Sequence, residues 1–131
     1  MPDLLTPTSA IDASALELEA LPLDPGDVEQ GSPRAAIAEL LGTPSLAVGV
    51  WELSEGVVRD TEVDEVFVVL SGRAEVEVEG SAEVLRLVPG VVGRLAAGSR
   101  TRWTVTETLR KVYVTASALE ASADGGAGSA R

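Results

Sequence analysis

The sequence predicts an all-β domain, a sandwich or small barrel of about seven short strands. Residues 74–79 read AEVEVE and alternate apolar with acidic side chains, which is the period-two pattern of a half-buried strand. Gly80 and Ser81 then supply a turn and 82–88 returns as the partner strand, so 73–88 predicts a hairpin. Further strands rich in Val, Thr and aromatic residues are expected at 46–53, 65–70, 103–109 and 111–115.

Residues 65–70, with the sequence EVFVVL, form a nearly continuous β-branched and aromatic run that ends at Ser71 and Gly72. A strand that is apolar on both faces is covered on both sides, as in a sandwich core or at a subunit interface. The sequence offers no long amphipathic helix to cover the second face. We therefore expect a symmetric homodimer that is built on the surface of the sheet.

Residues 33–41 carry two conflicting signals. Ser32, Pro33 and Gly42 match an N-cap, a first-turn proline and a C′ glycine, and the segment between them has high helix propensity. The local pattern alone therefore favours a helix of about nine residues. An isolated segment this short gains little from propensity, so packing decides its conformation.

The length of 131 residues is enough for one domain with one ordinary core. Apolar residues make up 45% and charged residues 24%, which excludes a wholly disordered chain. We expect an N-terminal extension at 1–20, which includes one strand laid against the sheet, a β-domain at 21–118 and a flexible C-terminal tail at 119–131. The sequence begins without the pattern of a signal peptide and has no apolar run long enough to cross a bilayer, so we expect a cytoplasmic protein.

Histidine and cysteine are both missing from the composition. Histidine is the commonest general base and metal ligand, and cysteine supplies thiolate nucleophiles, thiolate metal ligands and disulfides. The composition therefore excludes Ser-His-Asp and Cys-His catalysis, zinc fingers and the usual iron or zinc oxygenase sites.

The formal net charge is −11. Nucleic acids and anionic membranes attract positive charge, so we expect neither as a partner. Five basic residues nevertheless lie close together in the sequence, namely Arg94, Arg100, Arg102, Arg110 and Lys111. They could form a local anion site, but we favour the interpretation that they balance the acidic first part of the chain inside one domain.

Five fragments of the sequence resemble the cupin superfamily in their residues, their order and their spacing. The resemblance is specifically to a small single-domain subgroup related to ureidoglycine aminohydrolase and ethanolamine-utilisation cupins. The fragments are GVWE at 49–52 followed by Gly56, EVFVVLSG at 65–72, LVPG at 87–90, GSRTRW at 98–103 and ETLRKVYV at 107–114. The resemblance implies a jelly-roll β-barrel that is commonly homodimeric. It also implies that 35–41 is a strand, against its local propensity, and we adopt that prediction.

The sequence departs from the family pattern where cupins bind their metal. Counted from Glu65, the two histidines of the first cupin motif fall at Arg59 and Thr61. Counted from Gly90, the histidine of the second motif falls at Thr101. Of four possible ligands only Glu65 is retained, and one carboxylate does not hold a transition metal against water. We therefore expect no metal and no other cofactor.

Glu65 needs a partner if it points into the barrel, because an unpaired buried carboxylate is costly or must be protonated. We expect Arg59 to supply that partner as an internal ion pair, with Thr61 and Thr101 adding hydrogen bonds. Two other interpretations stay open, a polar pocket that binds a small ligand and catalysis by Glu65 with a raised pKa.

Two further groups of residues have mainly structural interpretations. The acidic run at Asp60, Glu62, Asp64 and Glu65 could bind a hard cation, but a solvated loop is the better interpretation. Trp103 lies two residues after Thr101 in a strand, so both side chains point to the same face, and we expect Trp103 to face the barrel interior. There it either fills the core or forms a stacking wall for a planar or sugar-like ligand.

The leading functional hypothesis is a cupin that binds a small polar molecule without a transition metal. The expected ligand-binding residues are Arg59, Thr61, Glu65, Thr101 and Trp103, and Glu65 is the candidate catalytic residue. One alternative is an enzyme similar to the ureidoglycine aminohydrolase group, acting on a small nitrogen compound or a carbohydrate. The other is a structural or regulatory dimer whose barrel is filled by side chains. An open polar cavity favours the first two hypotheses, and a packed lumen favours the third.

Overall fold

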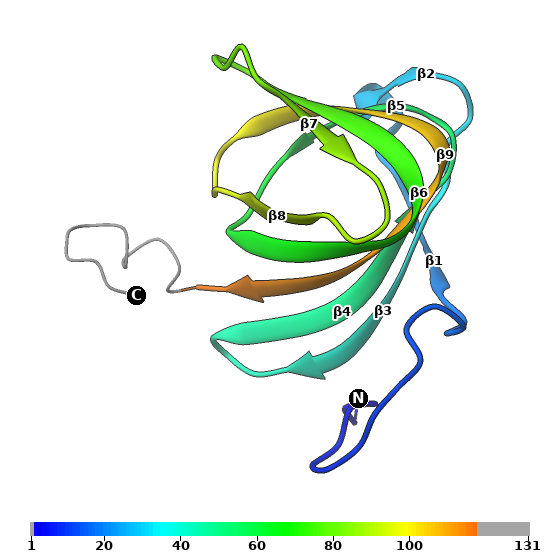
Figure 1. Ribbon diagram of the computed structural model, residues 1–131, viewed down its shortest axis with the longest axis vertical. Coiled ribbons are helices and arrows are strands. Elements are labelled where there is room, and N and C mark those ends of the chain that lie inside the picture. Colours follow the sequence, from blue (N-terminus) through cyan, green and yellow to red (C-terminus); the bar gives the residue numbers. More distant parts are fainter. Residues whose placement is uncertain (1, 118–131) are drawn as a thin grey trace, which may run out of the picture.

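The computed structural model describes residues 2–117, whose strands form one antiparallel sheet that curls into a jelly-roll barrel (Figure 1). The sheet order is β1-β3-β4-β9-β5-β2, and β6 pairs with β7, β8 and β9. A 3₁₀ turn, Pro25–Asp27, precedes β2. The strands are β1 (Glu19–Leu21), β2 (Val28–Gln30), β3 (Ala35–Gly42), β4 (Leu46–Leu53), β5 (Gly56–Thr61), β6 (Glu65–Val78), β7 (Val84–Leu87), β8 (Val92–Leu95) and β9 (Arg100–Ala116). The predicted all-β jelly roll is confirmed.

Two long strands, β6 and β9, form the spine of the barrel, and they pair with each other along almost their whole length. The sequence predicts a break at Ser71 and Gly72, but the structure has a register irregularity there instead of a chain reversal. At Gly72 φ is +95°, and a Cβ would overlap the backbone of Thr108. Only glycine allows this close approach, so the irregularity bends both strands and lets the two halves of the sheet face each other.

The predicted strand at 35–41 is confirmed as β3, which lies between β1 and β4 in the sheet. Its register places Ile37 opposite Trp51 and Ala35 opposite Leu53. Tertiary pairing therefore overrides the helix propensity of this segment, because a helix would leave the edge of β4 unpaired. The strand expected within 1–20 is β1, which begins at Glu19 and pairs with β3.

The core lies between the two halves of the curled sheet. Its most buried side chains include Leu53, Phe67, Val76 and Leu109. Gly93 lies opposite Phe67 in the β6–β8 pairing, and a Cβ at Gly93 would overlap the phenyl ring. Glycine at this position therefore makes room for one of the four aromatic residues of the chain.

The N-terminal segment is tied to the domain by backbone and side-chain contacts. Leu5 N donates to Leu40 O at 2.9 Å, and Gly42 N donates to Asp3 Oδ1 at 3.1 Å. Arg110 Nη1 donates to the carbonyl oxygens of Ala13 and Leu16, both at 2.9 Å. The boundaries drawn at 20 and 118 stay predictions, and the tail expected at 119–131 lies outside the described residues.

No helix within residues 2–117 is long and apolar enough to span a membrane.

The outer face of the sheet carries a band of valines across β9, β6 and β8. In register, Val68 of β6 lies between Val112 of β9 and Val92 of β8, and Val66 lies beside Val114. Val68 and Val92 are 37% and 65% exposed. Neighbouring exposed apolar side chains of this kind are typical of a surface that pairs with another chain.

We predict that this valine band forms the homodimer interface. Val68→Asp places a charge in its centre and should convert a dimer into a 13.5 kDa monomer in sedimentation experiments. Val63→Asp is the matched control, because Val63 is exposed in the loop before β6 and should not change the mass. A wild-type protein that is monomeric at micromolar concentration would contradict the prediction.

Candidate functional site

A buried lysine lies at the centre of the barrel. Lys111 of β9 is 4% exposed, and its Nζ donates to Glu65 Oε2 at 2.6 Å. The rings of Trp51, Phe67 and Trp103 surround the same ammonium, with centroids at 4.6, 4.7 and 4.8 Å from Nζ. The lysine is therefore held by one carboxylate and three aromatic rings.

Strand register and parity explain this arrangement. Lys111 lies opposite Trp51 of β4, so both side chains point to the same face of the sheet. Phe67 lies opposite Tyr113, two residues further along β9 on that same inner face. Trp103 comes from the first half of β9, and its ring reaches the Lys111 ammonium of the second half because β9 curves around the barrel (Figure 1). Four distant segments of the sequence thus meet at one ammonium group.

Burial and the neighbouring ammonium act on Glu65 in opposite directions. The pKa of the Glu65 carboxyl is raised, because removal from water and, to a smaller extent, the nearby Glu62 outweigh the charge and hydrogen bond of Lys111, which lower it. The Lys111 ammonium in turn gains electrostatic attraction from the faces of the three rings. The pair is therefore compensated as a unit, and removal of either partner alone leaves a buried charge.

A second buried carboxylate, Glu62, is bound by neutral donors. Glu62 is 7% exposed, and its Oε2 accepts from Thr101 Oγ1 at 2.6 Å and from Trp103 Nε1 at 3.0 Å. Backbone bonds hold it in place, because Glu62 N donates to Ser99 O and Gly98 N donates to Glu62 O. The expectation of a solvated acidic loop is wrong for Glu62, whose backbone is fixed to the loop that leads into β9.

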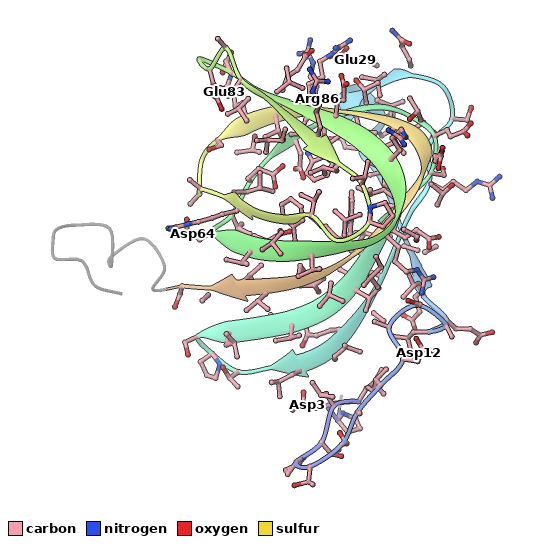
Figure 2. All side chains as sticks on the ribbon, viewed as in Figure 1. Asp3, Asp12, Glu29, Asp64, Glu83 and Arg86 are labelled. Atoms are coloured by element: carbon pink, nitrogen blue, oxygen red, sulfur yellow. The ribbon has the colours of Figure 1, made fainter. Side chains whose placement is uncertain are left out.

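A hollow of about 660 Å³ opens at the end of the barrel where the β6–β7 turn, the end of β5 and the start of β9 meet. In Figure 2, Glu83 marks the tip of the β6–β7 hairpin, and Glu29 lies at the same end of the molecule. Asp60 and Val78 flank Thr101 in register, and all three line the hollow. The rim is charged and polar, and includes Asp27, Arg59, Thr61, Glu77, Glu79, Ser81, Glu83, Arg100 and Arg102.

Asp60 is the residue of the hollow with the most perturbed acidity. Burial and, to a smaller extent, the nearby charge of Glu62 raise the pKa of its carboxyl from 3.8 to about 6, against a hydrogen bond from Thr61 N that lowers it. A carboxyl group with this pKa changes its protonation state close to neutral pH.

The expected ion pair between Arg59 and Glu65 is wrong. Arg59 lies opposite Arg102 and points out of the barrel, where its side chain is 67% exposed and pairs with Glu29. The physical reason is that successive side chains of a strand point to opposite faces of the sheet. Thr101 and Trp103 face inward, so their register partners Asp60 and Val58 face inward too, and Arg59 and Thr61 face outward.

The predicted site residues thus divide into two groups. Glu65, Trp103 and Thr101 are buried, and the inward position expected for Trp103 is confirmed. Arg59, Thr61 and Thr101 line the hollow, whereas Glu65 and Trp103 do not. Thr101 is the residue that the two groups share.

Most of the basic cluster balances acidic residues, as the favoured interpretation expects. Arg100 pairs with Glu79 at 3.9 Å, Arg110 with Glu52 at 2.9 Å and Lys111 with Glu65. Arg102 pairs with both Glu29 and Glu77.

The residues in the barrel do not fit a transition metal. Glu65, the ligand position that the cupin resemblance retains, is already bound to the Lys111 ammonium, and a second cation there would be repelled. In the described part of the chain no group of three Asp, Glu, His or Cys side chains is placed to hold a metal ion. The donor chemistry of the lumen is therefore that of an internal salt bridge.

Sequence reasoning missed Lys111, Glu62 and Asp60 as members of the site. A signal for the first was present, because Lys111 is the single lysine among ten basic residues of the chain. Glu62 and Asp60 were missed because Arg59 and Thr61 were expected on the inner face of β5, which is an error of one residue.

Comparisons with known proteins support the fold. Residues 43–113, more than half of the chain, match the model of the EutQ-like cupin domain. The EutQ protein of Clostridium difficile is similar in structure, with a TM-score of 0.63 and 20% identity over 82% of this chain and 85% of that protein. The cupin domain of Cnp3 from Schizosaccharomyces pombe has a TM-score of 0.62 and 20% sequence identity, and the similarity covers 85% of this chain and 76% of that domain. Curated proteins give no match.

A protein of unknown function from Pseudomonas syringae pv. tomato has a TM-score of 0.70 and 27% identity to this chain. The similarity covers 81% of this chain but 46% of that protein, so this chain spans less than half of its length.

A double-mutant cycle should show that Lys111 and Glu65 depend on each other. Lys111→Met leaves a buried carboxylate without its partner and should lower the free energy of unfolding by about 3–5 kcal/mol. Lys111→Met with Glu65→Gln should cost clearly less than the sum of the two single changes, because no uncompensated charge remains. Urea denaturation measures the four proteins, and Arg59→Gln on the exposed face should change stability little. Additive effects at 65 and 111 would contradict the pairing.

Asp60 should make stability fall as pH rises from about 4 to 6. Its folded pKa is raised, so the folded state holds a proton over this range that the unfolded state has released. Asp60→Asn removes this effect and should be more stable than the wild type at pH 7 by about 1 kcal/mol, after allowance for solvent screening at the hollow. Parallel pH profiles for the two proteins, measured by thermal denaturation, would contradict the raised pKa.

Proposed function

The chain belongs to the EutQ-like cupin domain family, and we propose that within this family it binds a small polar molecule at the end of its barrel without a transition metal. The observation that carries the proposal is the hollow of about 660 Å³ around Asp60 and Thr101. Its volume is in the range of small-molecule sites, and its walls come from three separate strand segments.

The composition of the hollow supports a polar ligand. Ionic and hydroxyl groups make up most of its lining, which includes Asp60 and its register partner Thr101. The Thr101 hydroxyl donates to Glu62 and accepts from Trp103 Nε1, so its orientation at the wall of the hollow is fixed. Fixed polar groups of this kind select a ligand by hydrogen bonding and discriminate against apolar molecules.

The filled interior explains why the proposed site lies at the end of the barrel. Trp103, Phe67, Glu65 and Lys111 are all buried and occupy the centre. This observation also favours the structural or regulatory dimer in part, because the central lumen is packed. Binding of a small molecule in the hollow around Thr101 would distinguish the two functions, since a purely structural barrel needs no ligand there.

Asp60 supports an enzyme as the second candidate function. A carboxyl group with a pKa of about 6 can donate and accept a proton near neutral pH, as a general acid or base must. In this candidate function Asp60, rather than Glu65, would be the catalytic residue, because Glu65 is held by Lys111. Turnover of a bound compound that is lost in Asp60→Asn while binding is retained would favour the enzyme over the binding protein.

The binding site can be located with a library of small polar fragments added to ¹⁵N-labelled protein. Hits should shift the amide signals at the end of β5, the β6–β7 turn and the start of β9. For the best hit, Asp60→Asn and Thr101→Val should each weaken binding about tenfold, the effect of losing one good hydrogen bond.

Asp64→Asn is the matched control, because Asp64 is also a carboxylate next to β6 but does not line this hollow. Hits that shift other regions, or that bind Asp60→Asn and Thr101→Val as well as the wild type, would contradict the proposal. A cytoplasmic location and the absence of nucleic-acid and membrane partners stay predictions.

A further inference from the structure

The surroundings of Lys111 concentrate rare residues of this chain at one point. The sequence contains four aromatic residues and a single lysine. Three of those four aromatics have their ring centroids within 4.8 Å of the lysine Nζ. They come from β4, β6 and β9, so the tertiary fold, and not local sequence, brings them together.

Three aromatic faces and one carboxylate around a cation form the chemistry that recognises organic ammonium ions. The rings supply their negative faces, and Glu65 Oε2 at 2.6 Å supplies the counter-charge. Trp51 and Trp103 meet edge to face, with centroids 5.5 Å apart and planes at 61°, so two walls of the cage support each other.

The type of basic residue fits this cage. Nine of the ten basic residues are arginines, and the ion pairs on the surface of the described chain use them. At the centre the chain uses lysine, whose compact ammonium presents its charge at one point to all three rings. An ordinary buried ion pair needs no aromatic cage, and replacing one by apolar residues is often stabilising.

We propose that the barrel interior is a binding site for a primary alkylammonium ion, and that the chain fills this site with its own Lys111. The side chain acts as a tethered ligand that excludes free amines and metal cations from the lumen. This proposal uses different residues from the hollow at the end of the barrel, so either can fail without the other.

The proposal is tested by removing the tethered ligand and supplying a free one. Lys111→Ala deletes the atoms from Cγ to Nζ, which together correspond to n-propylammonium. The variant is expressed and refolded with n-propylammonium chloride or with sodium chloride at the same ionic strength. Adding the amine before refolding removes any barrier to entry into the closed barrel.

We expect the amine to raise the melting temperature of Lys111→Ala and to increase its yield of folded protein. At about ten times its Kd the amine should raise the folding equilibrium constant about 11-fold. The wild type should not respond, because its own ammonium occupies the site. The neutral analogue 1-propanol and the anion propionate should give no comparable increase.

Two matched variants identify the determinants. Lys111→Ala with Glu65→Gln keeps the space but loses the counter-charge, and should bind the amine at least about tenfold more weakly. Lys111→Met fills the space without a charge and should not respond to the amine.

Several outcomes would overturn the proposal. They are a Lys111→Ala variant that gains neither melting temperature nor folded yield from n-propylammonium, equal rescue by 1-propanol, and equal rescue of the variant without the Glu65 carboxylate. A variant that fails to fold in sodium chloride and folds with the amine supports it.

Discussion

The ammonium of Lys111 inside the barrel constrains every element around it. Because its Nζ lies 2.6 Å from Glu65 Oε2, the start of β6 must stay beside the second half of β9. Because three rings pack against the same group, β4 and both halves of β9 are held at fixed distances from it. Separating Lys111 from Glu65 inside the barrel would leave uncompensated buried charges, so the cluster opposes packings that part these strands.

The same cluster decides where the protein can bind another molecule. Its side chains fill the centre, and Glu62 links the cluster through Thr101 to the hollow at the end of the barrel. One wall of the hollow is therefore hydrogen-bonded to the buried cluster, and another is formed by the β6–β7 turn. In this chain the position that the cupin pattern reserves for a metal ligand serves an internal salt bridge, and the polar groups left for a ligand lie further out.

The fold could be predicted from sequence because strand patterns and turns report on a sheet locally, and family resemblance corrected the one ambiguous segment at 35–41. The site was harder to predict, because the exact position of each residue in its strand decides whether its side chain points into the barrel. An error of one residue in β5 moved Arg59 to the inside and left Asp60 outside. Lys111 was missed for a different reason. Its aromatic neighbours are distant in sequence, and their meeting depends on a bend at Gly72 that local patterns do not reveal.

The most direct test of the central role of Lys111 is an NMR measurement on the wild type with selectively ¹³C-labelled lysine. The chain has a single lysine, so the εCH₂ signal needs no assignment. Three aromatic rings around it should move this signal strongly upfield through their ring currents, and the signal should stay shifted until the protein unfolds. An εCH₂ signal at the position of free lysine in the folded protein would place the side chain in solvent and contradict the account.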